Sequence, residues 1–247
     1  MRVLILGGTG EARRLAQLAS GERGLELVSS LAGRVRDPLL PAGTVRVGGF
    51  GGADGLRQWL RDNAIDVVVD ATHPFAAVIG AHAAAATTAT GIPLLRLERP
   101  AWSARPGDRW THVPDLGSAA LALPGLGARV FLTIGRQGVH AFAALADPWF
   151  LIRAIDPPAP PLPPRHELIL ARGPFTVEAE AALMAERRVD VLVTKNSGGA
   201  QTAAKLDAAR ALGLPVLVID RPAPAPATAV VATPDQALAW LRTRAAG

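Results

Sequence analysis

A short apolar run near the start of the chain leads directly into a glycine-rich turn. Residues 3–6 (VLIL) are followed by residues 7–13 (GGTGEAR). A buried strand, a glycine turn and a helix start, in this order, direct backbone amides and the positive end of the helix dipole toward an anionic phosphate. Glycine permits this close approach because it has no Cβ. The segment predicts one wall of a nucleotide site, formed by Gly7, Gly8, Thr9, Gly10, Glu11, Ala12 and Arg13.

The match to the dinucleotide-binding pattern G-x-G-x-x-G is incomplete. If the pattern starts at Gly8, Arg13 stands where the third glycine normally lets the helix pack closely on the strand. We expect Arg13 to contact a phosphate instead. A tight strand-to-helix turn with no ligand is the alternative interpretation of this segment.

Hydroxyl and guanidinium groups follow the second expected strand. Ser29, Ser30, Gly33 and Arg34 lie where an NAD site normally carries an Asp or Glu for the ribose 2′-hydroxyl. Arginine and hydroxyls suit a 2′-phosphate instead, because a guanidinium binds phosphate through two hydrogen bonds. The sequence therefore predicts NADPH, bound in part by Ser30, Gly33 and Arg34. A polar strand end with an exposed arginine is the alternative.

Two more turns are candidates for the same cofactor. Residues 48–52 (GGFGG) let backbone pass close to a flat or charged group, and Gly49 and Gly51 are assigned to the cofactor. Thr72 and His73 close the fourth expected strand, and the histidine is able to bind nicotinamide through its ring nitrogens. A flexible loop and a structural histidine are the respective alternatives.

Lysine is rare in this chain: of 26 basic residues, only Lys195 and Lys205 are lysines. Lys195 lies in the turn of residues 194–199 (TKNSGG), after an apolar run. A lysine ammonium is a compact charge that contacts a carboxylate or donates a proton, which suggests a chemical role at this strand end. Arg136 and Gln137 are candidates for further anion contacts. A chance occurrence of the lysine is the alternative.

The elements that must position these residues repeat within the chain. Three segments of the first half recur in the same order in the second: residues 3–10 align with 130–138, 66–72 with 190–196, and 91–100 with 213–222. Continuous apolar runs of four or five residues, each followed by a turn and an alanine-rich stretch, are typical of parallel strands buried on both faces. Helices are expected at residues 11–20, 53–63, 76–90, 177–187 and 199–212.

The predicted fold class is α/β, with two Rossmann-like, doubly wound parallel-sheet lobes and an interlobe cleft. The expected domains are residues 1–110, which bind NADPH, and residues 111–247, which bind the substrate. The boundary is placed within residues 102–114, where Pro, Gly and charged residues interrupt the pattern. Ligands of such sheets lie beyond the carboxyl ends of the strands, which is where the candidate turns occur.

Composition narrows the function classes. The chain lacks cysteine, and its five histidines show no metal-ligand spacing, so we expect no metal. No apolar run approaches the roughly 20 residues of a membrane span, and we expect a cytoplasmic protein with no membrane partner. The net charge of +5 is spread along the chain and Tyr is absent, which disfavours a nucleic-acid partner. A polyanionic small ligand explains the arginines equally well. The absence of P-loop and G-x-S-x-G patterns disfavours NTPases and hydrolases.

Six motifs together resemble the precorrin-6A reductases of cobalamin biosynthesis. In chain order they are ILGGTGEAR (residues 5–13), SLAGR (30–34), GGFGG (48–52), DATHPFA (70–76), TIGRQG (133–138) and TKNSGG (194–199). The resemblance implies an oxidoreductase that uses NADPH to reduce a ring double bond of precorrin-6A, a tetrapyrrole, giving precorrin-6B. It also implies two Rossmann-like lobes with the substrate between them and a terminal segment that exchanges between lobes.

The resemblance assigns roles to the turns. It matches the turns of the first half to NADPH and those of the second half to the corrinoid: Arg136, Gln137, Lys195, Asn196, Ser197 and Gly198. Lys195 is the expected catalytic residue, which orients a substrate carboxylate or helps to deliver the proton. Catalysis is expected to be mainly the positioning of hydride donor against acceptor.

Three alternatives remain open from the sequence. The substrate is cobalt-precorrin-6A if the metal is inserted earlier. A non-catalytic NADP-binding sensor module needs only the first half, and a two-lobed nucleotide-sugar transferase also has facing Rossmann-like halves. The sequence leaves the oligomeric state undecided and is compatible with a monomer.

Overall fold

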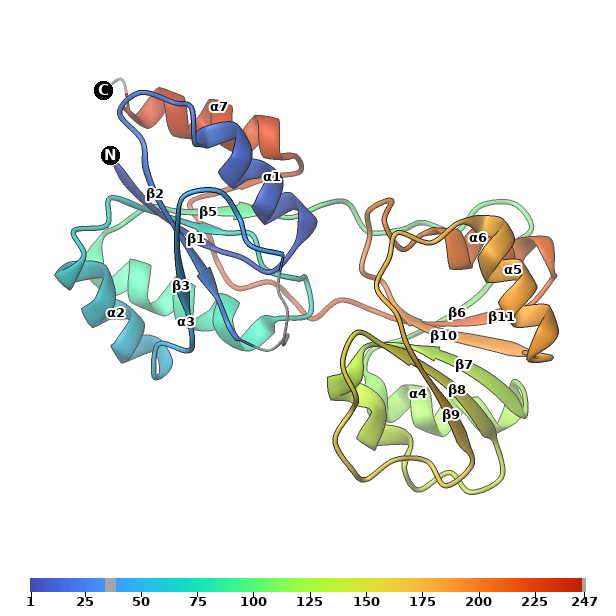
Figure 1. Ribbon diagram of the computed structural model, residues 1–247. Coiled ribbons are helices and arrows are strands. Elements are labelled where there is room, and N and C mark those ends of the chain that lie inside the picture. Colours follow the sequence, from blue (N-terminus) through green and yellow to red (C-terminus); the bar gives the residue numbers. More distant parts are fainter. Residues whose placement is uncertain (34–38, 246–247) are drawn as a thin grey trace. The chain divides into compact units, whose positions relative to one another are not determined.

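The computed structural model describes residues 1–33 and 39–245 and forms two compact units. The first unit comprises Met1–Pro100 and Ala223–Gly247, and the second comprises Ala101–Pro222. Each unit contains a six-stranded sheet in which the paired strands run parallel (Figure 1). The α/β class and the two parallel-sheet lobes are therefore confirmed.

The sheet of the first unit has the strand order β12-β5-β4-β1-β2-β3. Its strands are β1 (Arg2–Leu6), β2 (Glu26–Leu31), β3 (Thr44–Val47), β4 (Val67–Asp70), β5 (Leu94–Leu97) and β12 (Ala229–Val231). Its helices are α1 (Gly10–Ala19), α2 (Gly52–Asp62), α3 (Ala77–Thr90) and α7 (Pro234–Ala245).

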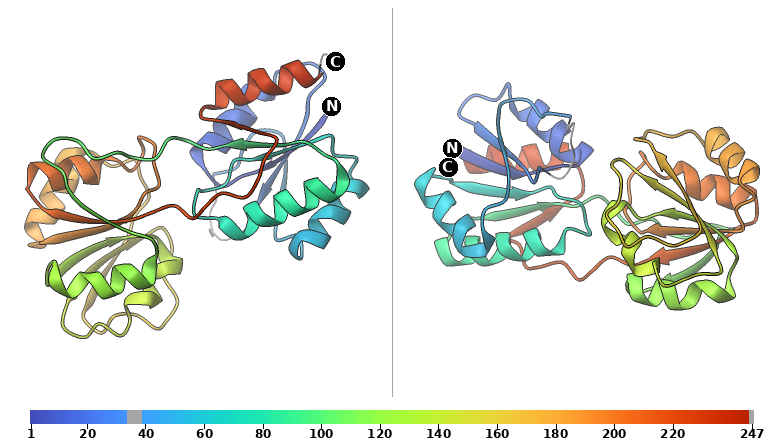
Figure 2. Two further views of the ribbon diagram at one scale, coloured as in Figure 1. Left: turned by 180° about the vertical axis from the view of Figure 1, so that it is seen from behind. Right: turned by 60° about the horizontal axis from the view of Figure 1, so that its bottom comes forward.

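Side chains alternate along β1 and build two cores, one on each face of this sheet. Val3 and Ile5 pack with α1 and α7, whereas Leu4 and Leu6 pack with α2 and α3. Figure 2 shows these helix pairs on opposite faces of the sheet. A strand covered on both sides must be apolar at every position, which explains the continuous apolar run at residues 3–6.

The sheet of the second unit has the strand order β6-β11-β10-β7-β8-β9. Its strands are β6 (Arg109–Val113), β7 (Arg129–Thr133), β8 (Trp149–Ala154), β9 (His166–Leu170), β10 (Val191–Lys195) and β11 (Pro215–Ile219). Its helices are α4 (Leu116–Ala122), α5 (Val177–Glu186), α6 (Ala204–Ala211) and two 3₁₀ segments, η1 (Leu123–Gly125) and η2 (Arg136–Phe142). Helices α5 and α6 pack on one face over a core that includes Phe131, Leu192 and Val218.

The internal repeat is confirmed by the strand orders. The recurring segments form β1, β4 and β5 in the first unit and β7, β10 and β11 in the second, at the same places in each sheet. The outermost strands beyond them are exchanged. The strand that follows β5 in the chain, β6, pairs with β11, and the strand that follows β11, β12, pairs with β5.

This exchange makes the compact units differ from the predicted ranges of residues 1–110 and 111–247. The first unit contains the chain up to Pro100 and again from Ala223. The returning segment belongs to it because β12 completes its sheet and α7 packs in the same core as α1. The stretch expected to be a boundary contains β6, whose residues RWTHV lack the apolar run of a central strand because β6 is an edge strand. Helix α6 also begins later than expected, at Ala204.

Candidate functional site

Each sheet has one point where the chain order of its strands reverses. It lies between β1 and β4 in the first unit and between β7 and β10 in the second. Helices wound to opposite faces diverge at such a point and leave a crevice beyond the carboxyl ends of the two strands, where ligands of open α/β sheets bind. Four of the predicted turns follow these four strands.

Thr9 organises the turn after β1. Its side chain caps helix α1 by accepting a hydrogen bond from the Ala12 amide at 3.1 Å, and donates one to the Ala71 carbonyl at 2.7 Å. Thr9 thereby ties this turn to the end of β4. Gly8 is exposed, has φ +110° and would have open space around a Cβ. The turn presents exposed backbone at a helix N-terminus, which suits a phosphate.

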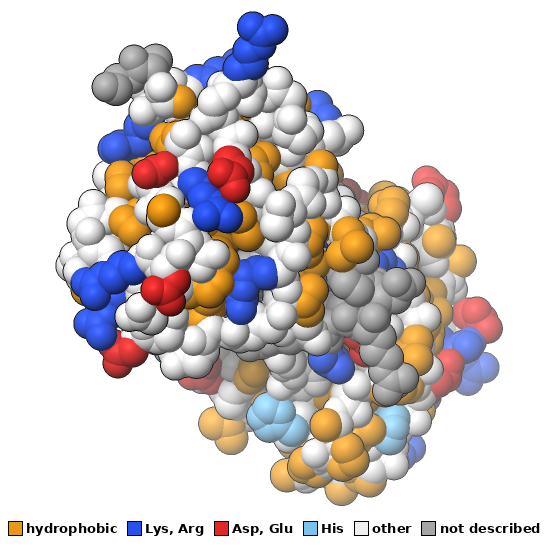
Figure 3. Space-filling model, turned by 60° about the vertical axis from the view of Figure 1, so that its left-hand side comes forward, with side chains coloured by type: hydrophobic (Ala, Val, Ile, Leu, Met, Phe, Trp, Pro, Cys, Tyr) orange, Lys and Arg blue, Asp and Glu red, His pale blue; other side chains and the backbone are white. Residues whose placement is uncertain are grey.

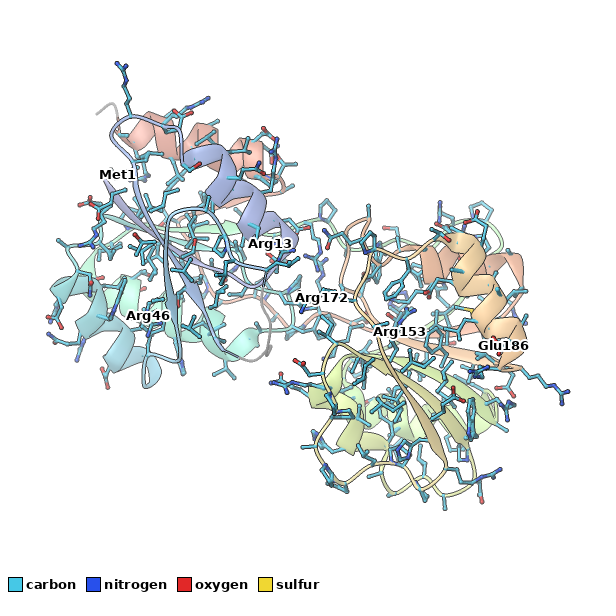
Figure 4. All side chains as sticks on the ribbon, viewed as in Figure 1. Met1, Arg13, Arg46, Arg153, Arg172 and Glu186 are labelled. Carbon is cyan, nitrogen blue, oxygen red and sulfur yellow. The ribbon has the colours of Figure 1, made fainter. Side chains whose placement is uncertain are left out.

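The structure corrects the register of the glycine pattern. A Cβ on Gly7 would lie 3.5 Å from the Ala12 Cβ, so the close helix-to-strand contact is made by Gly7 and Ala12 and not at Arg13. The pattern therefore starts at Gly7, with Thr9 at the second glycine position and Ala12 at the third. Arg13 therefore does not occupy the position of the third glycine. It lies half-buried at the start of α1 (Figure 4).

The end of β2 lies beside this turn, because the Gly7 amide donates to the Ser30 carbonyl at 2.9 Å. The Ser30 hydroxyl accepts a hydrogen bond at 2.8 Å from Arg46, its register partner on β3. Ser29 is 2% exposed and its hydroxyl has no hydrogen-bond partner within the described residues. Gly33 has φ +71°, and Arg34 lies outside the described residues.

Arg46 was missed in the sequence because it sits inside an expected strand. Its guanidinium donates to the carbonyls of Gly48 and Gly49, each at 3.0 Å, and stacks 3.8 Å from the ring centre of Phe50. Partial burial lowers the pKa of Arg46 from its ordinary value. The residue fixes the glycine loop and places a cation beside Ser30 (Figure 4). The sequence signal that could have identified Arg46 is its place two residues before the glycine loop.

The end of β4 holds a buried ion pair. Asp70 lies 3.7 Å from Arg96 of β5, and its other carboxylate oxygen accepts hydrogen bonds from the Thr72 amide and hydroxyl. Arg96 also donates to the Ala225 carbonyl of the returning chain. The His73 Nδ1 accepts a hydrogen bond from the Phe75 amide, so that its neutral form carries the proton on Nε2. Glu11 is neutralised by an ion pair with Arg99 at 2.8 Å.

In the second unit, Lys195 ends β10 and leads into a tight loop. The Ser197 amide donates to the Lys195 carbonyl at 2.7 Å, and Gly198 and Gly199 have φ values of +67° and +76°. Lys195 is half-buried, and burial lowers the pKa of its ammonium from the ordinary lysine value. A lysine with this shift releases a proton more readily than an exposed one.

The turn after β7 is a 3₁₀ segment, unlike the α-helix after β1. Gly135 has φ +77° and precedes Arg136, and Gly138 packs so tightly that a Cβ would lie 2.9 Å from Ile134. Gln137 is exposed and Arg136 is half-buried. Because β7 and β10 are neighbours, the structure brings this turn and the Lys195 loop to one edge of the sheet.

Charged side chains are buried behind that edge. Arg153 of β8 forms a two-pronged ion pair with Glu180 of α5, and its guanidinium stacks 3.8 Å from the Phe175 ring centre (Figure 4). Lys205 of α6 is 4% exposed. Burial and the nearby Arg153 lower its pKa to about 7, against the opposing effect of Glu180. The sequence singled out only the rarity of this lysine.

The predicted cofactor residues that are described thus gather at one edge of the first sheet, and the predicted substrate residues at one edge of the second. Among residues 1–33 and 39–245, no group of three or more Asp, Glu, His or Cys side chains is arranged to hold a metal ion, and no helix is long and apolar enough to cross a membrane. On the face shown in Figure 3, described basic side chains are interspersed with acidic ones.

Comparison with known proteins identifies the family. Residues 2–242 match the family described as precorrin-6x reductase CbiJ/CobK. The chain belongs to this family. It is 63% identical over 242 residues to a precorrin-6A reductase of Rhodococcus erythropolis, covering 98% of each chain.

More distant members and a solved structure agree with this membership. A cobalt-precorrin-6A reductase of Methanothermobacter thermautotrophicus is 30% identical over 235 residues, covering 90% of this chain and 77% of that one. The solved structure of CobK precorrin-6A reductase has a TM-score of 0.91 at 48% identity and covers 98% of this chain and 96% of that one. The exchanged strands therefore belong to a precorrin-6x reductase fold.

Proposed function

We propose that this protein is a precorrin-6A reductase of cobalamin biosynthesis that reduces one ring double bond of its tetrapyrrole substrate with NADPH. The observation that carries the proposal is the 63% identity, over 98% of both chains, to a protein of that name. The reaction adds a hydride to one carbon of the double bond and a proton to its neighbour, and leaves NADP⁺ and precorrin-6B.

The first unit is the proposed NADPH site. The exposed backbone of Gly8 and the N-terminus of α1 form a cradle for the pyrophosphate, with Arg13 beside it. Arg46 and Ser30 form the polar end of the cradle and are placed to receive the 2′-phosphate, with Arg34 as a further candidate. NADPH, when bound, supplies the hydride. The chain's own residues bind and orient it.

We assign His73 and Thr72 to the nicotinamide side of this site, because they follow β4 at the reversal point. The hydrogen bond from the Phe75 amide to His73 Nδ1 favours the Nε2–H tautomer, which offers one donor and no charge. We therefore assign His73 a binding role in this site. Glu11, paired with Arg99, holds the start of α1 and makes no phosphate contact of its own.

The second unit is the proposed tetrapyrrole site. Precorrin-6A carries several acetate and propionate carboxylates, for which Arg136, Gln137 and the loop after Lys195 offer donors. Lys195, with its lowered pKa, is the proposed proton donor or carboxylate anchor.

We propose metal-free precorrin-6A, and not cobalt-precorrin-6A, as the main substrate. The identity is 63% to the precorrin-6A reductase and 30% to the cobalt-precorrin-6A reductase. The protein is proposed to act in the cytoplasm.

Anaerobic mixing of the protein with NADPH and precorrin-6A tests this function. The absorbance of NADPH should fall in step with that of the substrate, and the product should be two hydrogen atoms heavier. Cobalt-precorrin-6A in a parallel reaction should react more slowly. If NADPH raises the thermal stability of the protein but is oxidised with neither substrate, the result would instead support a non-catalytic NADP-binding sensor.

A further inference from the structure

The loop that follows Lys195 is bonded to the two segments where the chain enters and leaves the second unit. This unit begins at Ala101 and ends at Pro222. Trp102, near the entry, and Arg221, near the exit, both donate hydrogen bonds to the loop of residues 196–199.

Trp102 holds the loop at three points. Its backbone amide donates to the Asn196 Oδ1 at 2.8 Å, and its carbonyl accepts from the Asn196 Nδ2 at 3.1 Å. Its indole Nε1 donates to the Gly199 carbonyl at 2.9 Å. Asn196 is 6% exposed, and a buried amide is stable only with both ends hydrogen-bonded. The loop therefore depends on Trp102 for its conformation.

Arg221 holds the same loop from the other side. Its Nε donates to the Asn196 carbonyl at 2.8 Å and its second nitrogen, Nη2, to the Ser197 carbonyl at 3.1 Å. Trp102 and Arg221 thus both hydrogen-bond the loop, through its backbone carbonyls and through the side chain of Asn196. Two adjacent glycines with positive φ give this loop little rigidity of its own, so these outside contacts set its shape.

The second lysine of the chain, Lys205, lies against this tryptophan. The Lys205 Nζ lies 5.0 Å from the centre of the Trp102 ring, within the distance of a cation–π contact. Lys205 extends from α6, is buried, and has the buried pair of Arg153 and Glu180 as charged neighbours. The face of the indole is thus fixed while its edge bonds the loop.

We propose that Trp102 and Arg221 are positioning residues that hold the ammonium of Lys195 in its reactive place. This inference rests on the proposed role of Lys195 in the reduction of precorrin-6A. Trp102 and Arg221 act on the reaction only through the loop after β10.

The scarcity of lysine makes a direct test possible without substrate. Trace acetic anhydride labels amines, and in this chain the amines are the N-terminus, Lys195 and the buried Lys205. The labelling rate of the Lys195 peptide is measured by mass spectrometry between pH 6 and pH 11, with the N-terminus as internal reference. It reports both the pKa and the accessibility of Lys195.

The informative variants are Trp102→Phe, which removes only the indole donor and keeps the backbone bonds, and Arg221→Gln. In both, the midpoint of labelling should rise toward the ordinary lysine pKa, and the plateau rate should rise about threefold or more as the loop opens to water. Arg210→Met is the matched control, because it removes a cation of α6 that pairs with Asp108 and Asp207 and leaves the loop bonds in place. An unchanged midpoint and plateau in both variants would overturn the inference.

Turnover separates this inference from the proposed function. Wild-type protein that does not reduce precorrin-6A contradicts the function, and the labelling result still decides whether Trp102 and Arg221 position Lys195. With an active wild type, Trp102→Phe should lower kcat about tenfold and leave the KM for NADPH within twofold. An equal loss in Arg210→Met would show general destabilisation and contradict the positioning role.

Discussion

The two units share a strand topology but differ in the turns that follow their central strands. In the first, an α-helix starts directly after β1 and Thr9 caps it, which leaves backbone amides for an anion. In the second, a 3₁₀ turn follows β7 and a lysine ends β10. The sheet alone therefore does not determine the chemistry. One copy offers backbone dipoles and the other a half-buried lysine ammonium.

The units differ also in what lies beneath the edge. The buried charges of the second unit include two cations, Arg153 and Lys205, against Glu180. Among its described residues, the first unit buries one cation, Arg96, against Asp70.

Glu180→Ala should cause the largest loss of stability. It leaves the guanidinium of Arg153 buried and unpaired beside Lys205, and breaking a buried pair in this way costs about 3–5 kcal/mol. Urea unfolding followed by tryptophan fluorescence measures this. Glu178→Ala on the same helix, where the side chain is exposed, should cost less than about 1 kcal/mol. Equal losses in the two variants would mean that the buried pair contributes nothing special.

Lys195→Met should lower kcat by about 10²–10³-fold and leave the KM for NADPH within twofold, because general acid catalysis contributes effects of this size. Lys195→Arg distinguishes the two proposed roles. Arginine keeps the charge and does not release its proton, so it retains activity only if Lys195 anchors a carboxylate.

The pH profile provides the second measurement on Lys195. Since burial lowers the pKa of Lys195, a proton donor at this position should lose activity on the alkaline side at a midpoint below the ordinary lysine value of 10.5. A flat kcat up to that value would contradict proton donation.

Lys205→Met should change how stability depends on pH. The pKa of Lys205 is about 7 in the folded chain and near 10.5 when unfolded, so between these values the unfolded chain binds more protons. The buried lysine therefore destabilises the wild type most below pH 7, and this penalty is relieved as the pH rises. Between pH 7 and pH 9 the wild type should gain roughly 2–3 kcal/mol relative to Lys205→Met. A constant difference would show that Lys205 keeps its ordinary pKa.

Arg46→Met should act on the first unit alone. Losing one phosphate contact should reduce the preference for NADPH over NADH about 10–30-fold, with kcat at saturating NADPH little changed. Arg57→Met is the matched control, since Arg57 lies on α2 and pairs only with Asp54 among the described residues. Equal losses with NADPH and NADH would mean that Arg46 merely fixes the glycine loop.

The sequence predicted the central strands well because they are buried on both faces. Apolar runs such as residues 3–6 and 191–193 have no other stable place, and the repeat placed them in equivalent positions. The exchanged edge strands could not be predicted in this way. In β6 the polar residues Arg109, Thr111 and His112 are exposed, and β12 has three residues, so neither strand has an apolar run.

The proposed site could be located from the sequence where a turn of unusual composition follows a strand, as at Gly7–Arg13 and Lys195–Gly199. Two residues of the proposed site were missed, one inside a strand and the other in a segment between strands. Arg46 lies within β3, and Trp102 lies in the segment expected to be a boundary. Their roles come from contacts between residues distant in sequence, such as Trp102 with Asn196, which local composition does not encode.

Amide hydrogen exchange in the presence of NADPH alone tests most directly whether the first unit, and not the second, binds NADPH. The amides of wild-type protein are compared with and without saturating NADPH, in the absence of tetrapyrrole. The account predicts strong protection of residues 7–13 and of the turns that follow β2 and β3, and little change at residues 133–138 and 195–199. Protection confined to these second-unit turns, or equal in both units, would contradict the assignment of NADPH to the first unit.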